Sequence, residues 1–359
     1  MKKIAIMTAG GDCAGLNSVI KTVVLSAEKN GITVVGVLDG YKGFIEKKYT
    51  VLTEKMVENI DSIGGTILGS SNKECPFHYP SKEDKNVYID RTDEGIEGLR
   101  ALGVDSMIVI GGDGTLDSAR VIHEHGLNCI GIPKTIDNDM SASDPTIGFD
   151  TAVEAATECI ERVRTTAYSH RRVMVVETMG RTSGYLTLYA GFASSADVIL
   201  LPEIEYNLDI VANKVKSVME SEKRCCIVVV SEAAKEKGKA EVIKKIVEDS
   251  FEQKRYGGVS ERLAESLEKM TGYEARNVVL GHIQRGGAPS VSDSILASRL
   301  GGFAMSLLLK NEFGKIVGIK NGNLEKMDFP KDRVPRLLNV KENDIIVTAR
   351  NMGVCFGDM

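Results

Sequence analysis

Two segments of the sequence combine residue types that suit phosphoryl transfer. In the first, the apolar run 107–110 leads directly into a turn at 111–115 with the sequence Gly-Gly-Asp-Gly-Thr. Glycines let backbone N–H groups approach an anionic ligand closely and point at it. Asp113, held in that turn, is a suitable ligand for a magnesium ion that bridges phosphate oxygens. The segment therefore predicts a phosphate-binding turn with a metal carboxylate.

The second segment, 133–139, ends the next apolar run with a lysine and two carboxylates, in the order Pro-Lys-Thr-Ile-Asp-Asn-Asp. Residues two apart in an extended segment face the same way, so Asp137 and Asp139 can address one cleft while Asn138 points elsewhere. One carboxylate is then available to take a proton from a hydroxyl group. Together the two segments predict a kinase-type site, with a sugar as the favoured acceptor.

Each segment also has a purely structural interpretation. Asp113 could serve only as a cap for the following helix, and the second segment could be an Asx-turn after Pro133. We favour the functional interpretation because loops that follow parallel strands are where α/β sheets bind ligands. A third glycine-rich turn, within 8–17, is less specific, because Gly11 suits a phosphate at a helix N-terminus and an ordinary tight turn equally well.

Arginines recur beside predicted strand ends. Arg172 precedes one strand and Arg181 follows it, while Arg276 precedes another strand and Arg285 follows that one. A lone surface arginine contributes little to a protein, but several at strand termini, two of them in glycine-bearing turns, suit bidentate phosphate binding. In this interpretation His282 is a substrate ligand, because the aspartates already supply the base.

Short apolar runs alternate with helical patterns along the chain, which predicts an α/β fold with parallel sheets. The runs are rich in valine and isoleucine and barely alternate, as expected of strands covered on both faces. Helices are predicted over 16–29, over 151–166 with Asp150 as N-cap, and over 299–310. The predicted strands are 4–7, 33–38, 107–110, 129–132, 173–176, 198–201, 225–230 and 278–280.

Composition narrows the function classes. The chain has 359 residues, 43% of them hydrophobic and 26% charged, and a formal net charge of −5. That charge gives no basic excess to favour nucleic acid or a membrane surface as a partner, and no apolar run is long enough to span a bilayer. The seven cysteines are odd in number and lack C-x-x-C spacing. They therefore argue against a disulfide framework or a zinc site and predict a cytoplasmic protein.

In combination, the motifs resemble the 6-phosphofructokinase family of the phosphofructokinase A type, over about residues 1–320. The resemblance implies transfer of a phosphoryl group from MgATP to O1 of fructose 6-phosphate, in glycolysis (EC 2.7.1.11). A lipid or NAD kinase shares the first turn but lacks the segments 135–139 and 282–287. A non-catalytic regulatory subunit would have lost Asp113, Asp137 or Arg181, and all three are present. The matching motifs are 8–17, 64–66, 111–115, 133–139, 179–181 and 281–287.

The resemblance implies a role for each matching residue. Asp137 is the base for the sugar hydroxyl, and Asp113 holds Mg²⁺. The ATP phosphates are expected against Gly11, Asn72, Lys73, Gly112, Gly114 and Thr115. The residues that position or stabilise the transferring phosphoryl group are Thr135, Asp139 and Arg181. The sugar phosphate is expected to contact Met179, Gly180, Glu232, His282 and Arg285, with Arg172 and Arg276 reaching it from a neighbouring subunit.

Two positions bear on the phosphoryl donor. Pyrophosphate-dependent members of the family resemble this chain at Lys134, where the bacterial allosteric ATP enzymes carry glycine. At Gly114 the chain instead matches ATP users, whereas pyrophosphate users typically have aspartate. A residue with no Cβ leaves the nucleotide pocket open, so we predict ATP, with pyrophosphate as the alternative. Asn72 stands where many relatives have an arginine that bridges the two substrates, and the adjacent Lys73 can replace it as a point charge.

The resemblance also implies two similarly wound three-layer α/β domains with mainly parallel sheets and the active site in the cleft between them. We predict a larger nucleotide-binding domain from 1–138 plus about 252–300. A smaller sugar-phosphate-binding domain would take 139–251 plus about 301–320, and 321–359 is an extension with no assigned role. The family's usual assembly, a homotetramer, is expected here.

Overall fold

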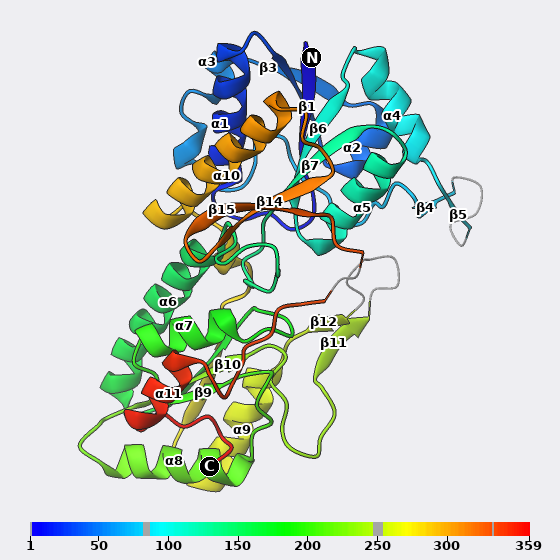
Figure 1. Cartoon of the computed structure of the whole chain (residues 1–359). Helices are drawn as coiled ribbons and strands as arrows, with labels where there is room; N and C mark the ends of the chain where they lie inside the picture. The colour runs from blue at the N-terminus through cyan, green and yellow to red at the C-terminus, as the bar shows by residue number, and fades with distance from the viewer. Residues whose placement is uncertain (1, 82–86, 247–253, 332–333) are drawn as a thin grey trace.

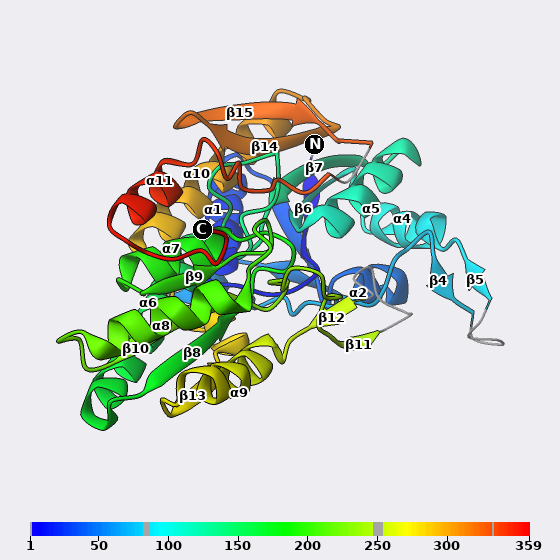
Figure 2. The same cartoon turned by 90° about the horizontal axis from the view of Figure 1, so that it is seen from below.

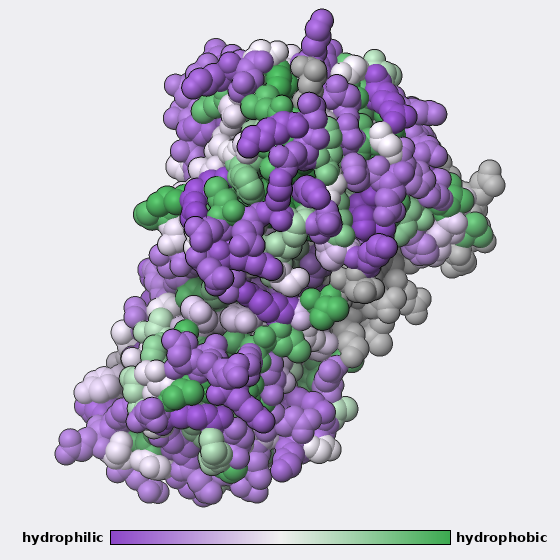
Figure 3. Space-filling model, viewed as in Figure 1, coloured by the Kyte–Doolittle hydropathy of each residue, from purple (hydrophilic) through white to green (hydrophobic). Residues whose placement is uncertain are grey.

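The computed structural model describes residues 2–81, 87–246, 254–331 and 334–359. Two α/β parts, drawn one above the other in Figure 1, are each built around a sheet of their own. The N-terminus lies in the upper part and the C-terminus in the lower part. On the face seen in Figure 3 the surface is mostly hydrophilic. No helix among the described residues is long and apolar enough to cross a membrane.

The sheet of the upper part has seven strands and a parallel centre. Only its two edges are antiparallel, where β3 pairs with β2 and β15 pairs with β14. In order across the sheet, the strands are β15 (Asn323–Asp328), β14 (Lys315–Lys320), β7 (Asn128–Pro133), β6 (Ser106–Gly111), β1 (Lys3–Thr8), β2 (Thr33–Val37) and β3 (Tyr49–Leu52).

The sheet of the lower part has four strands, all parallel. Every residue of its two central strands is buried, as the near-continuous valine and isoleucine runs predict for strands covered on both faces. In order across the sheet, the strands are β13 (Ala275–Val279), β8 (Val173–Thr178), β10 (Cys226–Ser231) and β9 (Val198–Leu200). Two small hairpins stand apart from both sheets: β4 (Tyr79–Pro80) with β5 (Tyr88–Ile89), and β11 (Ile243–Ile246) with β12 (Lys254–Tyr256).

Each predicted strand overlaps a strand of these two sheets, so the α/β fold with mainly parallel sheets is confirmed. The predicted helix 16–29 is also confirmed with its bounds. The helices are α1 (Leu16–Lys29), α2 (Tyr41–Glu46), α3 (Glu54–Val57), α4 (Thr92–Ala101), α5 (Asp113–Glu124), α6 (Phe149–His170), α7 (Tyr185–Ala193), α8 (Leu208–Glu220), α9 (Val259–Thr271), α10 (Val291–Leu309) and α11 (Asp344–Asn351), with 3₁₀ turns η1 (Ile60–Ser62) and η2 (Gly281–Arg285).

One predicted helix cap is wrong. Asp150 lies inside the first turn of α6, and Gly148, with a φ of 94°, occupies the N-cap position instead. The Asp150 carboxylate accepts a hydrogen bond from Ser290 Oγ at 2.6 Å. It therefore connects α6 to the start of α10.

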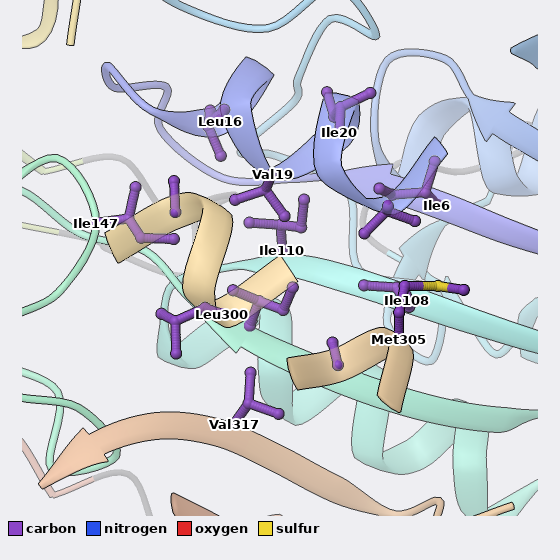
Figure 4. Packing of buried hydrophobic residues seen from close by; sticks show 14 of the residues in the cluster. Ile6, Leu16, Val19, Ile20, Ile108, Ile110, Ile147, Leu300, Met305 and Val317 are labelled. Atoms are coloured by element: carbon purple, nitrogen blue, oxygen red, sulfur yellow. The ribbon is translucent and has the colours of Figure 1, made fainter. Parts of the chain in front are cut away.

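Helices cover both faces of each sheet, which gives each part three layers. In β1, Ile4 and Ile6 belong to one buried cluster, and Ala5 and Met7 belong to another on the opposite face. The strands of the lower sheet also divide their buried side chains between two clusters. Figure 4 shows the first cluster, where side chains of α1, β6 and α10 pack together.

Our assignment of the later segments to the two parts needs correction. We expected residues from about 252 to 300 in the larger part and about 301–320 in the smaller one. Instead, α9 packs on β13 in the four-stranded sheet, while α10 packs on α1 and β14 joins the seven-stranded sheet. Hydrophobic periodicity identifies an element but not the sheet that will bury it. The predicted boundary near 251–252 lies outside the described residues.

The C-terminal extension, 321–359, belongs to both parts. It begins with β15 on the edge of the larger sheet and ends with α11, which packs against α7 in the smaller part. Figures 1 and 2 show the chain passing from the orange strand β15 to the red helix α11. The extension therefore spans the two parts.

A buried carboxylate joins α10 to the start of α6. Asp293 is only 1% exposed. One of its oxygens accepts a hydrogen bond from the backbone N–H of Gly148 at 2.9 Å. The other accepts from the N–H of Thr151 at 2.8 Å and from its hydroxyl at 2.6 Å. Burial raises the pKa of the Asp293 carboxyl, although the hydrogen bonds oppose that shift.

We expect Asp293→Ala to lower the free energy of unfolding by about 2–4 kcal/mol, because it leaves three buried donors without their acceptor. Thermal denaturation followed by circular dichroism measures the effect. The matched control is Asp328→Ala, because the Asp328 side chain is 83% exposed in a surface ion pair with Lys315, and its removal should leave the melting temperature close to that of wild type. Equal effects of the two substitutions would contradict this role for Asp293.

Candidate active site

A cavity of about 260 Å³ lies where the predicted turns meet. Its walls follow the carboxyl ends of β1, β6 and β7, which are neighbours in the larger sheet. The predicted site residues that line it are Gly11, Asn72, Gly112, Asp113, Gly114, Thr115, Lys134, Thr135, Asp137, Asp139, Arg181 and Arg285. The predicted site residues outside its lining are Lys73, Arg172, Met179, Gly180, Glu232, Arg276 and His282.

The turn after β6 presents the start of a helix to the cavity. Gly112 is the N-cap of α5, and its carbonyl accepts the N–H of Leu116 at 3.0 Å. The helix therefore begins at Asp113, so the N–H groups of its first turn face the cavity end. The Tyr41 hydroxyl donates to the carbonyl of Thr115 at 2.6 Å and helps to fix the first turn of this helix. A helix N-terminus of this kind is suited to bind phosphate.

Gly11 is required for the close approach of Arg285. A Cβ at Gly11 would lie 2.6 Å from Nη1 and 3.0 Å from Cζ of that guanidinium group. Arg285 Nε is buried and has no hydrogen-bond partner among the described residues. A half-buried guanidinium whose Nε donor is unused fits an anionic ligand in this cavity, because arginine binds phosphate through several N–H groups at once.

Lys134 adds a second positive charge to the cavity. Its side chain is buried, and Nζ donates a hydrogen bond to the carbonyl of Gly11. Its own backbone N–H donates to the carbonyl of Gly111 at 3.0 Å. The lysine thus connects the turn after β1 to the turn after β6.

Asp137 and Asp139 both line the cavity, as predicted, and each is 6% exposed. The predicted reason is wrong, because the segment is not extended. Asn138 has a φ of 51°, and its side-chain oxygen accepts from the N–H of Thr146 at 3.1 Å. This left-handed residue turns its own side chain away and returns the next carboxylate to the cavity. The N–H of Asp137 donates to Thr135 Oγ1 at 3.1 Å, which fixes the start of the turn.

Arg181 reaches the cavity from the smaller part, in the turn after β8. The turn has positive φ angles at Gly180 (133°) and Arg181 (54°). The backbone N–H of Arg181 donates to Glu232 Oε1 at 3.1 Å, and that of Met179 donates to the side chain of Gln284 at 3.3 Å. Burial raises the pKa of the Glu232 carboxyl. In this structure Met179, Gly180 and Glu232 therefore support the Arg181 turn from outside the cavity lining.

Arg172 and Arg276 share one carboxylate at the edge of the smaller sheet. Arg172 Nε donates to Glu274 Oε2 at 2.7 Å, and Arg276 Nη2 pairs with the other oxygen of Glu274. Arg276 also pairs with Glu268 at 3.3 Å. His282 and Lys73 have exposed side chains.

Tyr41, Glu74 and Pro335 are three of the cavity-lining residues that sequence reasoning missed. Tyr41 and Glu74 lie outside the motifs, and their packing against those motifs is decided by tertiary structure. Pro335 belongs to the C-terminal extension, for which we had no expected role. A signal was absent in all three cases, because none has a residue type or spacing that marks phosphate chemistry.

Within the described ranges, no three or more histidine, cysteine or acidic side chains cluster as a metal site would require. Asp113, Asp137 and Asp139 nevertheless line one cavity. This donor set fits Mg²⁺, which is usually held by one or two carboxylates together with water and substrate phosphates. It does not fit a site that binds a metal through protein ligands alone.

The chain belongs to the phosphofructokinase family, because the sequence profile of that family matches residues 3–308. It is 46% identical to an ATP-dependent 6-phosphofructokinase of Clostridium perfringens, over 100% of this chain and 99% of that protein. It is 41% identical to one from Synechocystis, again over 100% of this chain and 99% of the relative. Among solved structures, phosphofructokinase from Saccharomyces cerevisiae superimposes with a TM-score of 0.79 at 27% identity, covering 92% of this chain and 45% of that one.

We expect Gly11→Ala to lower kcat/KM about 10–100-fold, because the new methyl group displaces the Arg285 guanidinium from the cavity. Steady-state assays of phosphoryl transfer measure the loss. Gly302→Ala is the control, since a Cβ there meets its nearest atom at 3.9 Å, within helix α10. The control should keep wild-type kinetics. Wild-type kinetics in Gly11→Ala as well would show that the close contact with Arg285 is dispensable.

Proposed function

We infer that the chain is an ATP-dependent 6-phosphofructokinase, which transfers the γ-phosphoryl group of ATP to O1 of fructose 6-phosphate. The products are fructose 1,6-bisphosphate and ADP, a step of glycolysis. The observation that carries this conclusion is the convergence of Asp113, Asp137 and Arg181 on one cavity. The full-length relatives at 46% and 41% identity, both ATP-dependent 6-phosphofructokinases, agree with it.

We propose that Asp137 is the general base. Its carboxylate would accept the proton of the sugar's 1-hydroxyl as the oxygen attacks the phosphoryl group. Arg181 and Lys134 would stabilise the negative charge on the transferring group, because fixed cations act strongly in a site that excludes water. Thr135 and Asp139 would help to align that group. The support is their common place in the cavity lining.

We propose Mg²⁺ as the metal cofactor, held by Asp113 together with water and phosphate oxygens. When bound, the ion would bridge and neutralise phosphate oxygens of the nucleotide. Gly11, Asn72, Gly112, Gly114 and Thr115 would surround those phosphates. Lys73 is a weaker candidate for this role, because its side chain is exposed and lies outside the cavity lining.

The sugar phosphate is proposed to lie on the side of the cavity where Arg181 and Arg285 stand. Glu232, Met179 and Gly180 would act there mainly by holding the Arg181 turn, since they bind its backbone or belong to it. In this scheme the larger part is the nucleotide-binding domain, and the smaller part supplies the sugar-phosphate contacts.

We also propose a homo-oligomer, a tetramer by family resemblance, in which Arg172 and Arg276 complete a neighbouring subunit's site. Both arginines stand outside this chain's own cavity, and Glu274 holds them side by side. His282, which is exposed, would face the same contact between neighbouring subunits. A cytoplasmic location is proposed because none of the seven cysteines forms a disulfide.

We expect Asp137→Asn to reduce kcat roughly 10²–10⁴-fold, the usual range for removal of a general base. The asparagine keeps the shape of the side chain but cannot accept the proton. Initial rates of fructose 1,6-bisphosphate formation measure the loss, and Asp105→Asn, at an exposed position outside the cavity, is the control. An Asp137→Asn enzyme with wild-type kcat would rule out Asp137 as the base.

We expect the wild-type protein to form fructose 1,6-bisphosphate with MgATP and not with pyrophosphate as sole donor. Gly114, which has no Cβ, leaves room for the adenosine, and Lys134 is then permissive. Parallel initial-rate assays with each donor decide the question. Faster product formation with pyrophosphate would make Lys134 the decisive residue and overturn the donor, while leaving the sugar-phosphate half of the proposal in place.

A further inference from the structure

We propose that the C-terminal segment 335–338 positions the catalytic loop, and that Arg336 is the positioning residue within it. The catalytic loop is defined here as residues 137–139. This inference deepens the proposed function, because it rests on the role of Asp137 as the base. It assigns a role to an extension that lies beyond every motif of the sequence.

Arg336 binds the backbone of the catalytic loop through three hydrogen bonds. Its guanidinium donates to the carbonyl of Asn138 from Nη2 at 2.8 Å and from Nε at 3.2 Å. Its backbone N–H donates to the carbonyl of Asp139 at 2.5 Å. These carbonyls belong to the two residues that directly follow Asp137. Arg336 therefore fixes the loop through its main chain and leaves both carboxylates to the cavity.

The conformation of Asn138 benefits from such support. Asparagine enters the left-handed region more readily than most residues, but a φ of 51° is still less populated than the α and β regions, and surrounding contacts are needed to hold the loop in this one conformation. The side chain of Asn138 is held by Thr146 on one side. Its carbonyl is held by Arg336 on the other. Removal of the guanidinium removes one of these two restraints.

The remaining contacts of Arg336 tie the loop to its surroundings in both parts. Nη1 forms an ion pair with Asp144 at 2.6 Å, and the guanidinium lies over the ring of Tyr185 at 4.8 Å from its centre. Tyr185 is the first residue of α7, just after the turn that carries Arg181. The Arg336 side chain is 20% exposed. These half-buried contacts are stronger than those of a fully exposed arginine.

Leu338 continues the same connection two residues later. Its N–H donates to Glu203 Oε1 at 3.1 Å, and the same oxygen accepts the N–H of Gly184 at 2.9 Å. Gly184 is the N-cap of α7 and ends the turn of Arg181. The Leu338 side chain is buried in the core of the smaller part. The segment therefore contacts the loop of Asp137 at one residue and the support of Arg181 at another.

The base and the arginine come from different sheets, so their alignment depends on whatever joins the two parts at the site. Displacement of a reacting group by about 1 Å can cost about 10²-fold in rate. The segment 335–338 provides such a junction directly behind the catalytic loop, and Pro335 itself lines the cavity. Loss of Arg336 should therefore slow the chemical step more than it weakens substrate binding.

The test compares Arg336→Ala and Arg336→Lys with wild type in steady-state assays and thermal denaturation. We expect kcat to fall about 10–100-fold in Arg336→Ala, with KM for both substrates within about three-fold of wild type. Lysine keeps the charge beside Asp144 but lacks the fork that binds the carbonyl of Asn138. Arg336→Lys should therefore keep the wild-type melting temperature and still lose most of kcat. It also keeps the test decisive if Arg336→Ala does not fold.

The matched control is Arg350→Ala. Arg350 makes the same kinds of contact, an ion pair with Asp358 at 2.7 Å and a stack on Phe356 at 5.1 Å, but it lies on α11 away from the cavity lining. Its kcat should remain at the wild-type value. Guanidinium chloride at millimolar concentration should restore part of kcat in Arg336→Ala and none in the control.

The outcomes separate this inference from the proposed function. If wild type forms fructose 1,6-bisphosphate and both Arg336 variants match its kcat, the inference is wrong and the proposed function stands. If kcat and melting temperature fall in proportion in every variant, including the control, Arg336 is only a structural residue and the inference is again wrong. If wild type forms no product, the proposed function fails and this inference fails with it.

Discussion

The parallel pairing of β1, β6 and β7 is the constraint on which the site depends. Their register sets Thr8 opposite Ile110 and Gly111 opposite Pro133. The turns that follow the three strands therefore begin at one level on one edge of the sheet. Close packing on both faces holds this register, because a slip of one residue would move every side chain from one buried cluster into the other, where its shape does not fit. Because of this pairing, the glycine-rich turn 111–115 and the loop that carries Asp137 and Asp139 meet at one cavity.

Charges of both signs line the cavity in a chain whose formal net charge is −5. The cations are Lys134, Arg181 and Arg285, and the carboxylates are those of Asp12, Glu74, Asp113, Asp137 and Asp139. The cations suit phosphate oxygens, and the carboxylates suit a metal ion that is bound together with phosphate. In the proposed function, the cations that would bind phosphate in the ground state would also face the charge that develops during transfer. Binding and catalysis would then share one electrostatic arrangement.

The sequence was sufficient for the elements whose stability is local or regularly patterned. The buried runs of β1, β6, β8 and β10 are recognisable because strands covered on both faces must be continuously apolar. The strands β3, β14 and β15 were not predicted. β3 and β15 are the two edges of the larger sheet, and β14 pairs with β15, so all three lie outside the continuously apolar centre of that sheet. The placement of α9 in the smaller part, and of the whole of α10 in the larger part, was also beyond prediction. Both helices are amphipathic or apolar, and neither pattern says which sheet is its partner.

The same distinction explains which parts of the candidate site were foreseen. Asp113 and Asp137 carry carboxylates, a residue type that suits metal binding and proton transfer. Their positions after buried strands were therefore informative. Arg336 acts on backbone carbonyls, and every residue has a carbonyl, so the loop it supports carries no mark of that contact in its own sequence. The residues that support a catalytic loop are thus harder to predict from the sequence than the residues that carry its reactive groups. A resemblance that ends near residue 320 can identify the chemistry and still omit a contact that aligns it.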